Sequence, residues 1–250
     1  MIQFNGIASD DLGVIVEHYP RLIFPRRKVE MFQIPGRNGD QIIDQEVYEN
    51  YNQPYEVFFD SKRFGGLEAA IPKIASWLLS GTGYGRLEDS YNPKFYRMAF
   101  VPDSHDFLSF FNEYGRGTLT FNCMPERWYK DGEYEIAMTS GQTLYNPSGF
   151  KALPLLRFSS RTSSTITLTD ENGVSRTFDA SCIPSDTNVY LDAKEHAWLN
   201  RSTGIYTTPT AYGSSDAYSG SYDPLYLSKQ TTISWTGDMT LYIIPRWWTI

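Results

Sequence analysis

Three histidines and two cysteines are the residues of this chain best suited to metal binding or nucleophilic catalysis: His18, His105, His196, Cys123 and Cys182. A zinc site or an activated nucleophile needs such groups at short spacings or within a supporting motif. These five residues lie far apart in sequence, and no Gly-x-Ser-x-Gly elbow accompanies them. We therefore expect no metal, no cofactor and no catalytic residue. Reduced, buried thiols are the simplest interpretation of the cysteines, with a single disulfide as the alternative.

Two other patterns point more weakly to chemistry. The glycine-rich run Ser80–Arg86 resembles a phosphate-binding loop. It follows a predicted helix and lacks a Lys-Ser/Thr ending, so it is interpreted as the turn that ends the helix. Loop carboxylates such as Asp103 and Asp106 would suffice for glycoside hydrolysis if they lay roughly 5–9.5 Å apart. Sequence spacing does not establish that distance, and solvated loop carboxylates are the simpler interpretation.

The composition indicates a folded chain. It has 250 residues, 41% of them hydrophobic and 16% aromatic, with a mean hydropathy of −0.40. The aromatic share excludes disorder, because disordered segments lack the apolar surface that offsets chain entropy. The 22 Lys and Arg against 29 Asp and Glu give a net charge of −7, which argues against stable nucleic-acid binding. No run approaches ~18 apolar residues and no signal-peptide pattern opens the sequence, so we expect no membrane association.

The first half of the sequence has the pattern of short strands, in which β-branched, aromatic and polar residues alternate between Gly, Pro, Asn and Asp. The clearest examples are Tyr55–Phe59, Phe95–Val101 and Thr118–Cys123. One helix is predicted near 67–79, because its apolar residues recur at helical spacing. We expect Pro72 to lie in the first turn of this helix, where a proline is tolerated.

A domain boundary is predicted near residue 130, where turn signals replace strand runs, so that the domains are 1–130 and 131–250. In the second domain we predict one hairpin about Asp170–Gly173 and another about Thr236–Asp238. Short strands joined by tight turns favour an antiparallel sandwich or barrel. The predicted fold class is therefore mainly β, with one short helix.

The segment near 206–226 is rich in tyrosine among small and polar residues: Tyr206, Tyr212, Tyr218, Tyr222 and Tyr226. Simple linkers rarely contain so many aromatic residues. We expect an arm that packs against its own domain or another subunit. Aromatic rings also stack on sugars, so the alternative is contact with a partner or a glycan through Tyr206, Tyr212, Tyr218 and Tyr222.

The stretch Arg26–Gly39 alternates charged and apolar residues and then closes on a glycine-rich turn. Pro35 restricts the backbone at the start of that turn, while Gly36 and Gly39 permit positive φ. Such a strand suits a ribbon that meets another chain, and an isolated ribbon is marginal in water unless something covers it. We therefore predict an oligomer interface that contains Arg26, Arg27, Lys28, Met31, Phe32, Ile34, Pro35, Gly36, Arg37 and Gly39.

Taken in order, several short motifs resemble those of the distal tail proteins of long-tailed, non-contractile phages, a family often called Dit. The most specific is Ile34–Gly39, which matches the family's Ile-Pro-Gly-Arg-x-Gly element. The others are Phe4–Val14, Ser76–Leu79 with Leu87–Asp89, Phe121–Pro125, Asn146–Gly149 with Leu153–Arg157, Val189–Asp192, Thr232–Gly237 and Ile243–Trp248. Together they cover essentially the whole chain.

The resemblance implies a hub at the distal end of the tail in the virion, assembled in the host cytoplasm. It implies a hexameric ring lined by the first domain, a β-barrel or split barrel, with the second domain projecting outward as a galectin-like β-sandwich. The implied partners are further copies of the chain, the tail tube protein, the tape measure protein, and tail-associated, tail fibre or receptor-binding proteins. At 250 residues the chain leaves little room for the carbohydrate-binding inserts of enlarged members.

The acidic composition fits this implied role. A ring of negative potential repels phosphate, so DNA can transit the lumen without stable binding. We therefore expect a structural protein rather than an enzyme. Two alternatives remain: a host-glycan-binding adhesin of the tail tip, and a tail-associated glycosidase.

Overall fold

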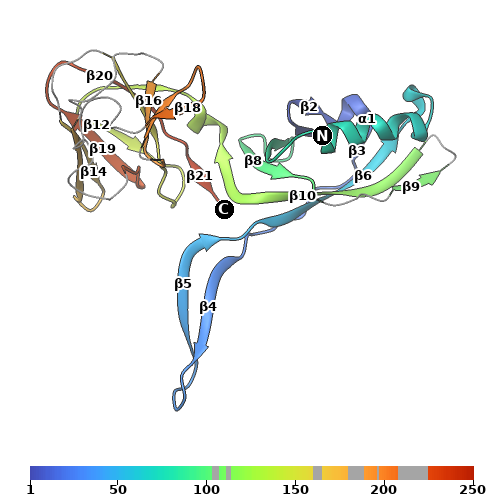
Figure 1. The fold of residues 1–250 in the computed structure, drawn as a ribbon, viewed down its shortest axis with the longest axis horizontal. Coiled ribbons are helices and arrows are strands. Elements are labelled where there is room, and N and C mark those ends of the chain that lie inside the picture. Colours follow the sequence, from blue (N-terminus) through green and yellow to red (C-terminus); the bar gives the residue numbers. More distant parts are fainter. Residues whose placement is uncertain (103–106, 111–113, 160–164, 180–188, 196, 208–224) are drawn as a thin grey trace. The chain divides into compact units, whose positions relative to one another are not determined.

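The computed structural model describes residues 1–102, 107–110, 114–159, 165–179, 189–195, 197–207 and 225–250. These residues form two compact units, Met1–Arg127 with Ile250, and Trp128–Thr249. Strands dominate both, and α1 is the one α-helix of the described residues, so the predicted mainly-β fold class is confirmed (Figure 1). No described helix is long and apolar enough to cross a membrane.

The first unit is built on one curled sheet whose strands run in the order β2-β1-β7-β8-β10-β6-β3, with β9 beside β10. Its helix and strands are α1 (Leu67–Leu79), β1 (Ile2–Phe4), β2 (Ile7–Ala8), β3 (Val14–Val16), β4 (Arg27–Gln33), β5 (Asp40–Tyr48), β6 (Tyr51–Asp60), β7 (Gly85–Asp89), β8 (Phe95–Phe100), β9 (Phe107–Phe110) and β10 (Tyr114–Tyr129). The antiparallel ladder between β6 and β10 is the longest in this sheet, from Cys123 opposite Tyr51 to Tyr114 opposite Asp60.

The helix α1 lies over one face of this sheet (Figure 1). Ala70, Ile74 and Trp77 are buried in the core that they share with the strands, as their helical spacing predicts. Pro72, however, lies inside the helix and not in its first turn, so that prediction is wrong. The helix spans Leu67–Leu79, as predicted, so that Pro72 is its sixth residue. It tolerates the missing N–H because Pro72 lies on its exposed side.

The second unit consists of two antiparallel sheets that share one hydrophobic core. The six-stranded sheet has the order β11-β20-β13-β16-β17-β18, and the four-stranded sheet has the order β12-β19-β14-β15. The strands of this unit are β11 (Ile136–Met138), β12 (Gln142–Tyr145), β13 (Leu155–Ser159), β14 (Thr165–Asp170), β15 (Ser175–Asp179), β16 (Val189–Asp192), β17 (Ala197–Asn200), β18 (Ile205–Thr207), β19 (Gln230–Trp235), β20 (Thr240–Ile244) and β21 (Trp248–Thr249).

Of the two hairpins predicted in this unit, one is confirmed and one is wrong. Strands β14 and β15 pair across the turn at Asp170–Gly173 as expected. Strands β19 and β20 do not pair with each other; they belong to the four-stranded and the six-stranded sheet, respectively. The connection at Thr236–Asp238 therefore crosses between sheets. It does so because Ile233 and Leu241 enter the same core from its two sides.

Candidate protein interaction surface

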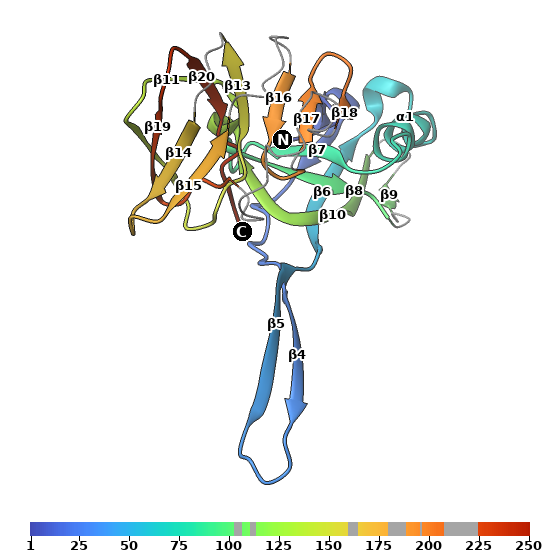
Figure 2. The same cartoon turned by 60° about the vertical axis from the view of Figure 1, so that its left-hand side comes forward.

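Strands β4 and β5 form a two-stranded ribbon that pairs with no other described strand. Figures 1 and 2 show this ribbon extending away from the sheet of the first unit that carries it. The predicted interface residues lie along it: Arg26 directly before β4, Arg27, Lys28, Met31 and Phe32 on β4, and Ile34, Pro35, Gly36, Arg37 and Gly39 in the connecting turn. The structure therefore brings all ten together on one projecting element.

The turn has the geometry that its sequence requires. The Arg37 N–H donates to the Ile34 carbonyl at 3.1 Å, and Gly36 has φ 80. A proline at the second position and a positive-φ glycine at the third are typical of a type II turn. Gly39 also has positive φ, at 82, so the expected role of both glycines is confirmed. No heavy atom would meet a Cβ at either glycine, so backbone conformation, and not crowding, selects them.

At its base the ribbon contains a bulge held by one carboxylate. The pairing register shifts between Arg27 and Val29, and the strand opposite carries Glu46 at a positive φ of 57. Asp44 accepts a bond from Arg27 Nη1 at 2.9 Å and another from the Glu46 N–H at 2.9 Å. The Tyr48 hydroxyl and then the Asp44 carboxylate raise the pKa of Arg27. Bulges bend and twist a strand pair, so this cluster sets the direction in which the ribbon leaves the body.

The ribbon is apolar on both faces, and this is its most informative property. Met31 pairs with Ile42 on one face, while Phe32 and Ile43 lie on the other. All four side chains are exposed to solvent, from Met31 at 62% to Ile43 at 48%. A ribbon without partner chains would pack one face on its own core or carry polar side chains on both faces. Two exposed apolar faces therefore make the ribbon a candidate surface for contact with partner chains.

The prediction from sequence stopped at Gly39 and missed half of this surface. Ile42, Ile43 and Val47 on β5 are as exposed as their counterparts on β4. A signal was present, because two consecutive apolar residues such as Ile42 and Ile43 in a strand must point to opposite faces. Together with the turn and β4, these residues complete the surface.

A buried polar cluster stiffens the body that carries the ribbon. The Asp89 carboxylate accepts bonds from Arg97 Nη1 at 3.0 Å and from the Tyr55 hydroxyl at 3.2 Å. Arg97 Nε donates to the Tyr51 hydroxyl at 2.9 Å. Burial raises the pKa of both tyrosines. Because each charge has an opposite charge and neutral hydrogen-bond partners, the cluster is a structural ion pair with no group poised for proton transfer.

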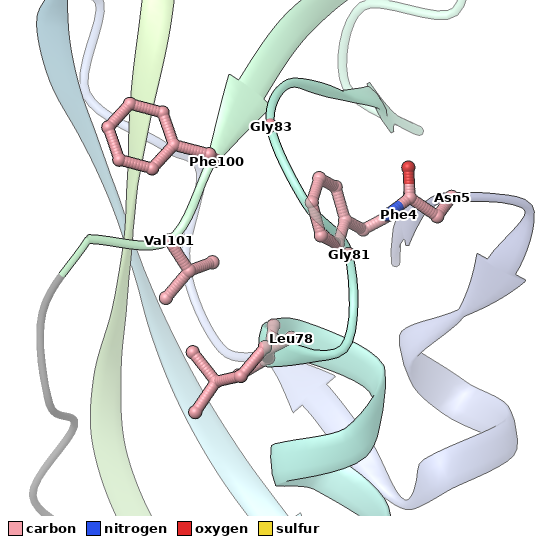
Figure 3. A pocket seen from close by; sticks show the side chains of 8 residues that line it. Phe4, Asn5, Leu78, Gly81, Gly83, Phe100 and Val101 are labelled. Carbon is pink, nitrogen blue, oxygen red and sulfur yellow. The ribbon is translucent and has the colours of Figure 1, made fainter.

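One cavity among the described residues is too small for most substrates. The cavity at the exit of α1 has a volume of ≈ 90 Å³, and Phe4, Leu78, Phe100 and Val101 surround it (Figure 3). Ligand pockets are usually about 300–1,000 Å³. Gly81 and Gly83 line the cavity between α1 and β7, which confirms Ser80–Arg86 as a helix-ending turn. Among the described residues no group of three His, Cys, Asp or Glu could hold a metal ion.

Of the other residues that the sequence singled out, the structure describes some and not others. Cys123 is a free, buried thiol, as predicted. Tyr206 is half exposed on β18 and donates to Asp192 at 2.9 Å, so it packs on its own sheet. The remaining residues of these predictions, namely His105, His196, Cys182, Asp103, Asp106, Tyr212, Tyr218 and Tyr222, lie outside the described residues.

Comparisons with known proteins place this geometry in context. No protein-family model and no curated protein sequence matches the chain. The crystal structure of the SPP1 Dit (gp 19.1) protein, described as a paradigm of the hub adsorption apparatus in phages that infect Gram-positive bacteria, matches with a TM-score of 0.71 and 15% identity. That match covers 97% of this chain and 96% of the other. The phage P2 baseplate matches in its activated conformation with Ca at a TM-score of 0.47 and 7% identity, and with Sr at 0.45 and 8%; each match covers 97% of this chain and 89% of the other.

The SPP1 comparison shows the fold, and that fold is the one that the motifs predicted. The resemblance to Dit proteins is thus confirmed in three dimensions over almost the whole chain. The two baseplate matches have TM-scores too low to support an argument.

Proposed function

We propose that this chain is a structural hub protein of a phage tail, which forms a hexameric ring at the distal end of the tail in the virion. The observation that carries the proposal is the ribbon, which exposes apolar side chains on both faces in a chain with the fold of a hub protein. A ribbon of this kind is marginal alone, so assembly is the state in which it is stable.

In this proposal the ring joins the tail tube and tape measure proteins to tail-associated, fibre or receptor-binding proteins. The net charge of −7 per chain supports passage of DNA through the ring, because negative potential disfavours phosphate contacts. No described residue favours the two alternatives, a glycan-binding adhesin or a glycosidase. The carboxylates and most of the tyrosines that suggested them lie outside the described residues.

The test is the mass of the purified full chain by light scattering, with negative-stain images of the same sample. We expect six copies in a closed ring. The double variant Met31→Ser/Ile42→Ser should be monomeric, because it removes the apolar pair from one face of the ribbon. The matched control Tyr145→Ser/Val174→Ser removes similarly exposed apolar side chains from the second unit and should still form rings. A monomeric parent chain, or rings formed equally well by the ribbon variant, would contradict the proposal.

A further inference from the structure

A ring of identical chains requires two different surfaces on each chain. In such a heterologous contact, each copy offers one surface to the next copy and a second surface to the previous one. If the ribbon is the first surface, the chain must carry a complementary apolar patch elsewhere. This reasoning rests on the proposed function and asks where on the neighbouring copy the ribbon binds.

A second apolar patch lies in the segment between β3 and β4. Tyr19, Leu22 and Phe24 are all exposed within six residues, and the Tyr19 ring also packs edge-on against Tyr91 at 4.9 Å. Phe24, at 74%, is the most exposed large apolar side chain among the described residues. The other exposed apolar residues of this unit outside the ribbon, such as Met1, Ile71 and Leu79, are scattered along the chain. Isolated exposed residues are normal on a surface, whereas a cluster marks a contact site.

A hollow adjoins this patch on the outward face of the sheet. It has a volume of ≈ 430 Å³ and lies between the segment His18–Arg21 and the strand residues Pro54, Glu56 and Thr118. The strand residues alternate with the buried Tyr55 and Leu119, so they belong to the face that the unit's own core leaves uncovered. The hollow is large enough for the side chains of a tight turn.

The patch is held in place before any partner arrives. The Glu17 N–H donates to the Glu56 carbonyl at 2.9 Å, and Gln53 Nε2 donates to the Arg21 carbonyl at 3.1 Å. Ile23 packs on the core between the exposed Leu22 and Phe24. Because the segment is fixed at these points, little chain entropy would be lost when a partner binds.

We propose that this acceptor surface, Tyr19–Phe24 with the adjoining hollow, receives the ribbon of a second copy of the chain. The ribbon face with Met31 and Ile42 lies on the apolar patch, and the turn Ile34–Arg37 enters the hollow. The charges agree with this arrangement. Glu56 at the hollow, which lies 3.8 Å from the exposed His18 Nε2 of its own chain, would approach Arg37 of the turn, and Arg21 would approach Asp40 at the start of β5. Arg37 and Asp40 are both exposed on the ribbon.

Cross-linking of paired cysteines tests this arrangement in the full chain. The variant Leu22→Cys/Met31→Cys, in a Cys182→Ser background, is treated with a short bis-maleimide reagent; the native Cys123 is buried and does not compete. We expect a covalent ladder that extends to the number of copies in the ring. Either single cysteine should give no species beyond a dimer, and the control pair Met31→Cys/Val174→Cys should give no ladder. Leu22, Met31 and Val174 are exposed, so substitutions at these positions should leave the fold intact.

A charge exchange provides a second, independent measurement. Arg37→Glu and Glu56→Arg should each lower the apparent affinity between copies several-fold, and the double variant should recover most of that loss. Intact rings without a Leu22–Met31 ladder and without recovery would overturn the acceptor assignment while leaving the hub proposal standing. A parent chain that stays monomeric would overturn both.

Discussion

Two antiparallel strand pairs in the first unit differ in where they place their apolar residues. Along β6, the side chains of Tyr51, Tyr55 and Val57 are buried, while Asn52 and Glu56 between them are exposed. This strict alternation lets β6 and β10 cover one core with one face. The ribbon of β4 and β5 splits its apolar residues between both faces and buries neither. The same type of antiparallel pairing therefore covers a core in β6 and β10 and forms a projecting ribbon in β4 and β5.

The contrast extends to their ion pairs. Arg97 and Asp89 meet at 3.0 Å inside the body, and Arg27 and Asp44 meet at 2.9 Å on the ribbon. Their geometries are nearly equal, but the first pair is almost wholly buried and the second is largely open to water. Solvent and salt weaken an exposed pair, whereas breaking a buried pair leaves a charge without compensation. The contribution of each ion pair to stability is therefore decided by its burial and not by its distance.

The largest expected effect comes from breaking the buried pair. Asp89→Ala should lower the free energy of unfolding by about 3–5 kcal/mol, because Arg97 would remain buried without its carboxylate. Asp44→Ala should change it by at most about 1 kcal/mol. Both are measured by urea unfolding in the monomeric Met31→Ser/Ile42→Ser background, so that assembly does not contribute to stability. Equal losses would show that the body and the ribbon depend on their ion pairs to the same degree.

Much of the ribbon and of the helix α1 could be predicted from the sequence. Three features depend on residues that are close together in the chain: the turn at Pro35 and Gly36, the alternation of charged and apolar residues on β4, and the helical spacing of Ala70 and Ile74. The β5 side of the ribbon was missed because the consecutive Ile42 and Ile43 break the simple alternation by which strands are recognised.

Features that depend on distant segments were not predictable in this way. The connection at Thr236–Asp238 has the sequence of a hairpin turn, yet its two strands enter different sheets because the core needs apolar side chains on both sides. The acceptor hollow joins His18–Arg21 to Pro54 and Thr118, which only tertiary structure brings together. The Asp89–Arg97 cluster likewise depends on Tyr55, from a strand far away in sequence.

A second prediction uses the Cys123 thiol to test whether water is excluded from the core of the first unit. Burial raises the pKa of Cys123 to about 12, against about 8.5 for a free thiol. Between these values the folded chain keeps a proton that the unfolded chain has lost, so stability falls as pH rises, by about 1.4 kcal/mol per pH unit. Below about pH 8.5 this contribution is fully present.

Cys123→Ala should remove that part of the pH slope, and unfolding curves between about pH 9 and 11 measure the difference from the parent chain. The comparison is made between slopes because burial also raises the pKa of Tyr51 and Tyr55 in both proteins. In the folded parent the thiol should also resist maleimide labelling until urea unfolds it. Parallel slopes together with rapid labelling would mean that water reaches this part of the core.

The smallest expected effect tests the ribbon itself. Glu46 has φ 57, a conformation in which glycine avoids the strain of a side chain. Glu46→Gly should therefore change ribbon stability by less than about 1 kcal/mol, because relief of strain offsets the extra chain entropy of glycine. Gln41→Gly, at an exposed β5 position without positive φ, lacks that compensation and should destabilise the ribbon by about 0.5–1 kcal/mol. Hydrogen exchange of the β4 and β5 amides measures this local opening directly. If both glycines loosened the ribbon equally, the positive φ of Glu46 would carry no strain that glycine relieves.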